Sequence, residues 1–200
     1  MYSLILDSST KILYVCLIKD NSILFEEYIS GRNDHAKNIV KKVDEALKSA
    51  SISASDLDEV VCGIGPGSYT GVRMAVTVCK MLAVFMNKPL YTISTLRLMA
   101  SGYKGKVLSM IDARRGNAFS MIIDNDKNET ILDEGMYEIN TLDKDFVDFI
   151  VKEDDYKVDP FYCLNNKNLC EEPHLLVPNY LRDTEAERNL KWLDFVKKLT

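Results

Sequence analysis

A strand, a glycine-rich loop, a helix and a second strand follow one another between residues 59 and 93, and this order constrains the fold more than any other feature. Residues 59–64 are a mostly apolar run, residues 65–71 interrupt it, and residues 72–86 return to a helical pattern before Pro89 begins another strand. A strand joined to the next strand through a helix pairs with it in parallel. The segment therefore predicts a parallel strand pair with a helix packed against the sheet.

Three strands precede this crossover, at residues 4–7, 12–18 and 23–29, with a tight turn at residues 20–22. Residues 33–50 then form a helix with one apolar face, capped by Asn33 or Asp34. Its apolar residues are Ala36, Ile39, Val40, Val43, Ala46, Leu47 and Ala50. Hairpins followed by a crossover predict a mixed sheet covered by helices.

The second half begins again with strands. We expect strands at residues 107–111, 118–123 and near 130–132, a helix at 141–152 and a closing helix at 184–199. The chain is therefore predicted to be an α/β protein of two lobes, each with a mixed sheet and helices, the second lobe being reduced. The expected division is residues 1–102, residues 103–183, and a C-terminal helix at 184–200 whose lobe is left open.

Composition excludes several classes of protein. With 25 Lys and Arg against 30 Asp and Glu, the net charge is -5, which argues against a domain that grips nucleic acid by electrostatics alone. The N-terminus lacks the basic and long apolar regions of a signal peptide, and no uncharged apolar stretch approaches 18 residues. Five cysteines without a Cys-x-x-Cys pair fit a reduced, cytoplasmic protein that does not enter a membrane.

The loop Gly-Ile-Gly-Pro-Gly-Ser-Tyr-Thr-Gly at residues 63–71 is the most informative motif. Its glycines expose backbone amides at the positive end of the following helix, which suits either an anion or a tight packing turn. It completes neither a P-loop nor a dinucleotide-binding fingerprint. Candidate phosphate or tRNA contacts in it are Gly65, Gly67, Ser68 and Thr70.

Together with LDSST at the N-terminus, DHAKNIVKKVDEAL, DARRGNAF and PNYLRDTEAE, the segment GIGPGSYTGVRMA resembles the bacterial TsaB (YeaZ) proteins. These segments occur in the family's order and span nearly the whole chain. The resemblance implies an actin-like ATPase fold of the sugar kinase and heat-shock chaperone superfamily. It also implies a role in making N6-threonylcarbamoyladenosine at position 37 of tRNA, as the dimerisation subunit.

The resemblance implies partners as well. A TsaD-like paralogue carries the metal and transfers the threonylcarbamoyl group to adenine, a TsaE-like ATPase joins the pair, and tRNA is met through the complex. Self-association as a homodimer is left open. No cofactor is expected in this chain alone, whereas ATP or ADP and Mg²⁺ are expected at the level of the complex.

The chain lacks the metal-binding histidine pair of the TsaD-like relatives. Two histidines four residues apart share one face of a helix, but here His35 is followed at that spacing by Ile39, and His174 lies far along the chain. We therefore expect no metal site and no catalytic residue. Asp7 and Asp112 end corresponding strands of the two lobes and could organise a nucleotide-bound cation, although turn and cap chemistry is the favoured interpretation.

Arg114 and Arg115 are the sharpest basic feature, on an expected hairpin turn with Lys104 and Lys106 nearby. Guanidinium groups bind carboxylates or phosphates through two parallel hydrogen bonds, so the pair could contact an acidic partner or tRNA. Exposed arginines are also often merely solvated. Both interpretations stay open at this stage.

The second helix carries a second apolar seam opposite the one expected to pack on the sheet. Its residues are Met74, Val78, Met81 and Phe85, and His35 on the first helix is added as a candidate interface residue. Either the first helix covers this seam or a partner does, and a partner is the favoured explanation. The main hypothesis is thus an interaction protein, with an ATP-dependent small-molecule kinase as the alternative and a peptidase as a weaker third.

Overall fold

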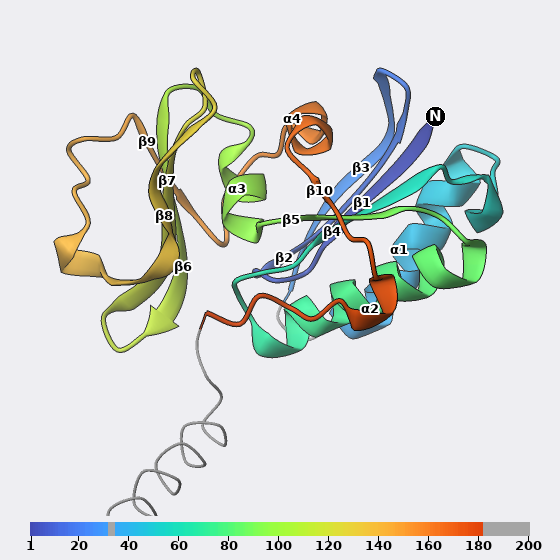
Figure 1. Ribbon diagram of the computed structural model, residues 1–200, viewed down its shortest axis with the longest axis horizontal. Helices are drawn as coiled ribbons and strands as arrows, with labels where there is room; N and C mark the ends of the chain where they lie inside the picture. The colour runs from blue at the N-terminus through green and yellow to red at the C-terminus, as the bar shows by residue number, and fades with distance from the viewer. Residues whose placement is uncertain (32–34, 182–200) are drawn as a thin grey trace, which may run out of the picture.

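The computed structural model describes residues 1–31 and 35–181, except for the side chains of residues 35–37. Two sheets lie side by side with helices between them and on one outer face (Figure 1). The first has six strands in the order β10-β5-β4-β1-β2-β3, and the second has four in the order β8-β7-β6-β9. The fold is α/β with two mixed sheets, as the sequence predicted.

Three antiparallel strands open the first sheet, namely β1 (Tyr2–Asp7), β2 (Ile12–Lys19) and β3 (Ser22–Ser30). β4 (Glu59–Gly63) pairs in parallel with β1, and β5 (Leu90–Ile93) pairs in parallel with β4. The predicted crossover and mixed sheet are therefore confirmed. The sheet ends in β10 (Asn168–Leu169), a two-residue strand antiparallel to β5 that sequence periodicity missed.

α1 (His35–Ser49) and α2 (Tyr69–Met86) cover one face of this sheet. Ile39, Val43 and Ala46 of α1 pack in the same buried cluster as Val72 and Cys79 of α2. Val40, which sits at the edge of the expected apolar arc, is instead exposed. The predicted caps Asn33 and Asp34 lie outside the described residues.

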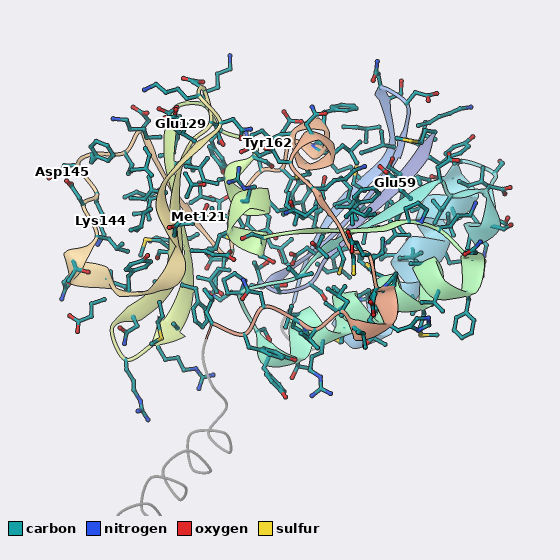
Figure 2. The ribbon with its side chains drawn as sticks, in the orientation of Figure 1. Glu59, Met121, Glu129, Lys144, Asp145 and Tyr162 are labelled. Atoms are coloured by element: carbon teal, nitrogen blue, oxygen red, sulfur yellow. The ribbon has the colours of Figure 1, made fainter. Side chains whose placement is uncertain are left out.

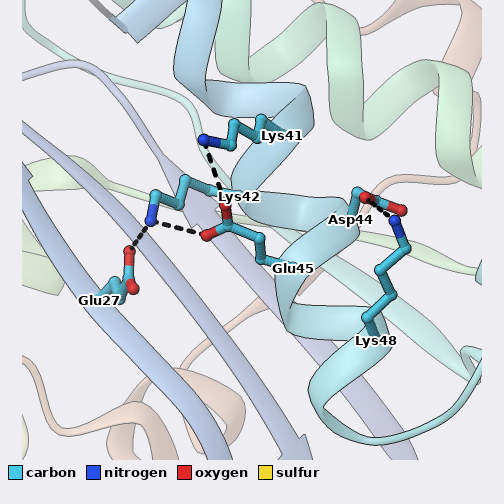
Figure 3. A network of polar contacts seen from close by, with 6 residues as sticks. All are labelled: Glu27, Lys41, Lys42, Asp44, Glu45 and Lys48. Atoms are coloured by element: carbon cyan, nitrogen blue, oxygen red, sulfur yellow. Dashed lines mark hydrogen bonds and ion pairs between the residues drawn. The ribbon is translucent and has the colours of Figure 1, made fainter.

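Ion pairs fix α1 against the neighbouring strand (Figure 3). The Lys42 ammonium lies 2.8 Å from a Glu27 oxygen on β3 and 2.7 Å from a Glu45 oxygen on its own helix. Lys41 lies 3.6 Å from Glu45, and Lys48 lies 2.6 Å from Asp44. Both carboxylates of α1 are therefore already paired with lysines of that helix.

The second sheet consists of one central hairpin with a further strand at each edge. β6 (Lys106–Arg114), β7 (Asn117–Asp124) and β8 (Glu129–Glu138) are antiparallel neighbours, and β9 (Phe149–Lys152) pairs in parallel with β6. The prediction of a helix at 141–152 is wrong. Phe149, Ile150 and Val151 extend along the free edge of β6, where Val151 is buried, so that backbone pairing outweighs the weak helical spacing.

Between the sheets lie α3 (Thr95–Ala100) and, after β9, α4 (Pro160–Asn165), neither of which was expected from the sequence. One buried cluster includes residues from both sheets, from α3 and from α4. β10 returns to the first sheet, so residues 168–169 lie apart from the second sheet. The lobe boundaries at 102 and 183 stay predictions. The expected helix at 184–199 lies outside the described residues.

Three 3-10 turns complete the described chain: Ala54–Asp56, Ile139–Thr141 and Pro173–Leu175. α2 is the one helix in the described part of the chain that is long and apolar enough to cross a membrane by length and composition. That is weak evidence for a membrane span, because a core helix passes the same test. The side of α2 that carries Val72, Ala75 and Cys79 packs within the molecule.

Candidate functional site

The glycine-rich loop at residues 63–71 packs against the turn that follows β1. A Cβ atom on Gly71 would lie 2.1 Å from the Ser8 carbonyl oxygen, and one on Gly67 would lie 2.2 Å from the Ser9 carbonyl oxygen. Both distances are far below contact range, so the glycines let the two backbones approach each other. The motif therefore has a packing reason at these two positions.

Several amides of the loop are already bonded within the chain. The Ser68 amide donates to the Ser9 carbonyl at 2.7 Å, and the Gly65 amide donates to the Thr95 hydroxyl at 3.0 Å. The Gly71 amide donates to the Ser68 hydroxyl, which caps α2. This arrangement favours the packing turn over an anion cradle. A phosphate or tRNA role for Gly65, Gly67, Ser68 and Thr70 stays a prediction.

Asp7 at the end of β1 is completely buried beneath this loop. Its Oδ1 accepts a hydrogen bond from the Ser9 amide at 2.6 Å, and its Oδ2 accepts one from the Thr95 hydroxyl at 2.5 Å. Burial raises the pKa of the Asp7 carboxyl, and the two hydrogen bonds oppose that shift only in part. The carboxyl thus braces three segments from inside and faces no open cleft, as the cap interpretation predicted.

The turn after β1 also packs against the chain beyond β9. Ser8, Ser9 and Thr10 are buried, and the Thr10 hydroxyl lies 3.0 Å from the Tyr156 hydroxyl, which comes from beyond β9. Outside this contact, Lys11 lies 2.9 Å from Glu153 and also pairs with an adjacent aspartate. These contacts bury the turn after β1 beneath side chains of the later part of the chain.

The basic hairpin lies at the far end of β6. Arg114 and Arg115 are exposed at the β6–β7 turn, with φ of 65° and 56°. Asp112 is exposed as well, and its Oδ1 accepts the Arg114 amide at 2.7 Å, which is turn chemistry and not a cleft carboxylate. The structure does not bring the arginines together with the glycine-rich loop through any contact among described residues. Whether they touch tRNA stays a prediction.

The second seam of α2 is partly covered and partly open. Met81 is 53% exposed and Phe85 is 73% exposed. Met74 and Val78 are half-buried and, with Ile39 and Val40 of α1, help line a groove of about 400 Å³ between the two helices. Packing beside α1 therefore covers Met74 and Val78 in part, whereas Met81 and Phe85 stay exposed. The side chain of His35, the remaining interface candidate, lies outside the described residues.

A segment that sequence analysis missed runs along the other side of α2. Residues 173–181, which we call the flanking segment, lie beside the helix (Figure 1). The Lys80 ammonium donates to the carbonyl oxygens of His174 and Leu176, and the rings of Tyr69 and Tyr180 stack with centroids 5.1 Å apart. Proline and mixed polarity hide this segment from periodicity arguments, and the fold shows that it lies beside α2.

Comparison with known proteins identifies the family. The model of the TsaD family, described as tRNA N6-adenosine threonylcarbamoyltransferase, matches residues 24–144, which is more than half of the chain. The tRNA threonylcarbamoyladenosine biosynthesis protein TsaB of Bacillus subtilis is 25% identical, over 98% of this chain and 100% of that protein. The chain belongs to the TsaB/YeaZ family. The protein of the same name from Escherichia coli is 32% identical, over 64% of this chain and 57% of that protein.

Solved structures of the TsaB/YeaZ family show the same fold. A Pseudomonas aeruginosa protein described as uncharacterised, with similarity to the peptidase YEAZ, superposes with a TM-score of 0.74 at 23% identity. The match covers 90% of this chain and 99% of that one. YeaZ from the same organism gives a TM-score of 0.65 at 25% identity, over 75% of each chain. The expected family and fold are both confirmed.

Proposed function

We propose that this chain is a non-catalytic dimerisation subunit of the complex that makes N6-threonylcarbamoyladenosine at position 37 of tRNA. In this proposal it works in the cytoplasm, binds and stabilises a TsaD-like transferase, associates with a TsaE-like ATPase, and meets tRNA through the complex. The observation that carries the proposal is the open apolar face of α2 at Met81 and Phe85, in a chain of the TsaB/YeaZ family. Apolar side chains left open on a packed helix are typical of a protein interface.

The burial of the turn after β1 supports the non-catalytic part of the proposal. A phosphotransfer enzyme of this fold needs room for a nucleotide beside the turn after β1, and the contacts of that turn with Tyr156 and with the glycine-rich loop support the non-catalytic interpretation. Among residues 1–31 and 38–181, no three His, Cys, Asp or Glu side chains gather as a metal site. In this proposal ATP or ADP and Mg²⁺ belong to the complex, and no catalytic residue is assigned to this chain.

The central test is association with the TsaD-like protein of the same organism. We expect the wild-type chain to co-elute with it in size-exclusion chromatography. We expect Met81→Asp and Phe85→Asp each to raise the dissociation constant at least tenfold. A carboxylate buried in an apolar interface loses its hydration without gaining a partner. Circular dichroism should show unchanged folding, because both side chains are exposed in the free chain. Unchanged association of both folded variants would remove the proposed interface.

The kinase alternative has its own test. Titration of the isolated chain with ATP and Mg²⁺ in a calorimeter is expected to give no binding in the micromolar range, because Thr10 and Tyr156 pack against each other at the turn after β1. Micromolar binding, or phosphate transfer by the isolated chain, would favour the kinase and contradict the assignment made above. Peptide hydrolysis by the isolated chain would likewise favour a peptidase.

A further inference from the structure

The most exposed apolar side chains of the described residues gather on three elements. Phe85 of α2 is 73% exposed, Leu175 and Val177 of the flanking segment are each 69% exposed, and Val40 of α1 is 62% exposed. Every other large apolar side chain in the described part of the chain is less exposed than these four. α1 and the flanking segment lie on opposite sides of α2, so the exposed seam of that helix runs between two apolar borders.

The flanking segment is held in place before any partner arrives. Its backbone is tied by the Lys80 ammonium, at 2.8 Å from the His174 carbonyl and 3.0 Å from the Leu176 carbonyl. The Asn179 amide donates to the Ile64 carbonyl at 2.8 Å, and its side chain donates to Glu134 at 2.7 Å. Leu176 packs inward against the cluster under α2, which leaves its two neighbours outside. A segment already ordered loses little conformational entropy on binding.

Charge distinguishes a second copy of this chain from a different subunit. α2 contains no acidic residue, and Arg73 is exposed on it beside Tyr69. The two carboxylates of α1, Asp44 and Glu45, are paired with lysines of α1 itself (Figure 3). A second copy docked through the same face would therefore offer no unpaired α1 or α2 carboxylate to the guanidinium. A partner whose apolar helix carries a carboxylate would complement it.

We propose that the flanking segment is the third element of the docking face, and that its occupant is a helix of a different subunit with apolar residues and a carboxylate opposite Arg73. This inference rests on the proposed function and takes the TsaD-like transferase as that subunit. Leu175 and Val177 then contact the partner on one side of α2, while Val40 contacts it on the other. Arg73 forms the charged rim between them.

The test compares matched pairs of new carboxylates. The double variant Leu175→Asp/Val177→Asp is expected to raise the dissociation constant for the TsaD-like protein at least tenfold. Ile23→Asp/Ile131→Asp places two carboxylates at exposed positions on β3 and β8, away from the face, and should stay within twofold of wild type. Arg73→Glu should weaken binding, and added salt should weaken the wild type but not the variant, because a like-charge pair replaces the opposite-charge pair at the rim.

Met81→Asp separates this inference from the function on which it rests. If Met81→Asp weakens binding but the flanking-segment variant binds like wild type, the flanking segment is not part of the docking face and the proposed function survives. If the wild-type chain does not bind the transferase at all, the proposed function fails. Light scattering tests the occupant: a stable homodimer that Leu175→Asp/Val177→Asp dissociates, and that an excess of the TsaD-like protein does not displace, would overturn the choice of a different subunit.

Discussion

Asp7 links the glycine-rich loop, the turn after β1 and the start of α3 through its two oxygens. The same Thr95 hydroxyl also accepts the Gly65 amide, so the carboxyl supports the loop through Thr95. Gly63 lies so close that a Cβ there would meet the Asp7 side chain at 1.8 Å. A group enclosed in this way holds its proton more tightly than it would in water, because burial disfavours the charged form.

The raised pKa of Asp7 predicts a pH dependence of stability. Between the ordinary carboxyl pKa and the raised one, the folded state binds more protons than the unfolded state, so the contribution of Asp7 is fully present below the ordinary value and is lost as pH rises through the raised value. Asn at this position keeps an acceptor for the Ser9 amide and does not ionise. Urea unfolding from about pH 4 to about pH 8 should show the wild type losing stability relative to Asp7→Asn.

The difference in the free energy of unfolding between wild type and Asp7→Asn tests this prediction, because the other titratable groups contribute equally to both proteins. This difference should favour the wild type most at the acidic end of the range and should shift toward Asp7→Asn as pH rises. A difference that stays constant with pH, or one that grows in favour of the wild type as pH rises, would show that Asp7 is not destabilised by ionisation in the folded state.

At the scale of elements, β10 depends on one buried ion pair. The Lys167 ammonium pairs with the Glu59 carboxylate on β4 and lies 4.2 Å from the centre of the Tyr91 ring on β5. Glu59 also accepts the Ser3 hydroxyl at 2.8 Å, and both charged side chains are largely buried (Figure 2 labels Glu59). Two residues of strand pairing are too few to hold an edge by themselves, so this pair fixes the short strand to the sheet.

Lys167→Ala should therefore cost about 3–5 kcal/mol in the free energy of unfolding, because it leaves the Glu59 charge buried without its partner. The control is Glu59→Gln/Lys167→Met, which removes both charges and keeps similar volumes, and which should cost much less. Chemical denaturation of the two variants beside wild type gives both numbers. Equal losses in the single and double variants would mean that the pair acts through packing and not through charge.

The elements that the sequence predicted correctly are those whose pattern is long enough to be read locally. The strands of β1 to β3 and the β4–α2–β5 crossover show clear alternation, glycine punctuation or a helical face. α3 and α4 have six residues each and pack in the buried cluster that both sheets share, whereas β10 has two residues and pairs on the free edge of β5. No window of sequence contains that information.

The candidate site divides in the same way. Met81 and Phe85 follow from helical spacing alone, whereas the covering of Met74 and Val78 by α1 depends on how two helices lie on one sheet. The flanking segment has no period, and its contacts in the fold, such as those of Lys80 with backbone carbonyl oxygens, show where it lies. Spacing therefore predicts which residues could be open, and packing decides which of them are.

For the whole molecule, the important feature is the buried cluster between the two sheets. Ile5 and Val61 of the first sheet share it with Val107 and Phe119 of the second, and Leu96 of α3 is completely buried within it. Lys11 and Tyr28 add polar contacts across the same boundary. Because neither sheet covers this face alone, the two are expected to unfold together.

This expectation can be tested with Leu96→Ala, which should cost about 2–5 kcal/mol through lost burial and the cavity left behind. Both wild type and variant should unfold in one transition that superposes when followed by far-ultraviolet circular dichroism and by tyrosine fluorescence. Leu24→Ala on the exposed side of β3 is the control and should cost less than about 0.5 kcal/mol. Two separate transitions, with Leu96→Ala shifting only one of them, would show that the sheets are independent units and that the contacts across the cleft do not couple them.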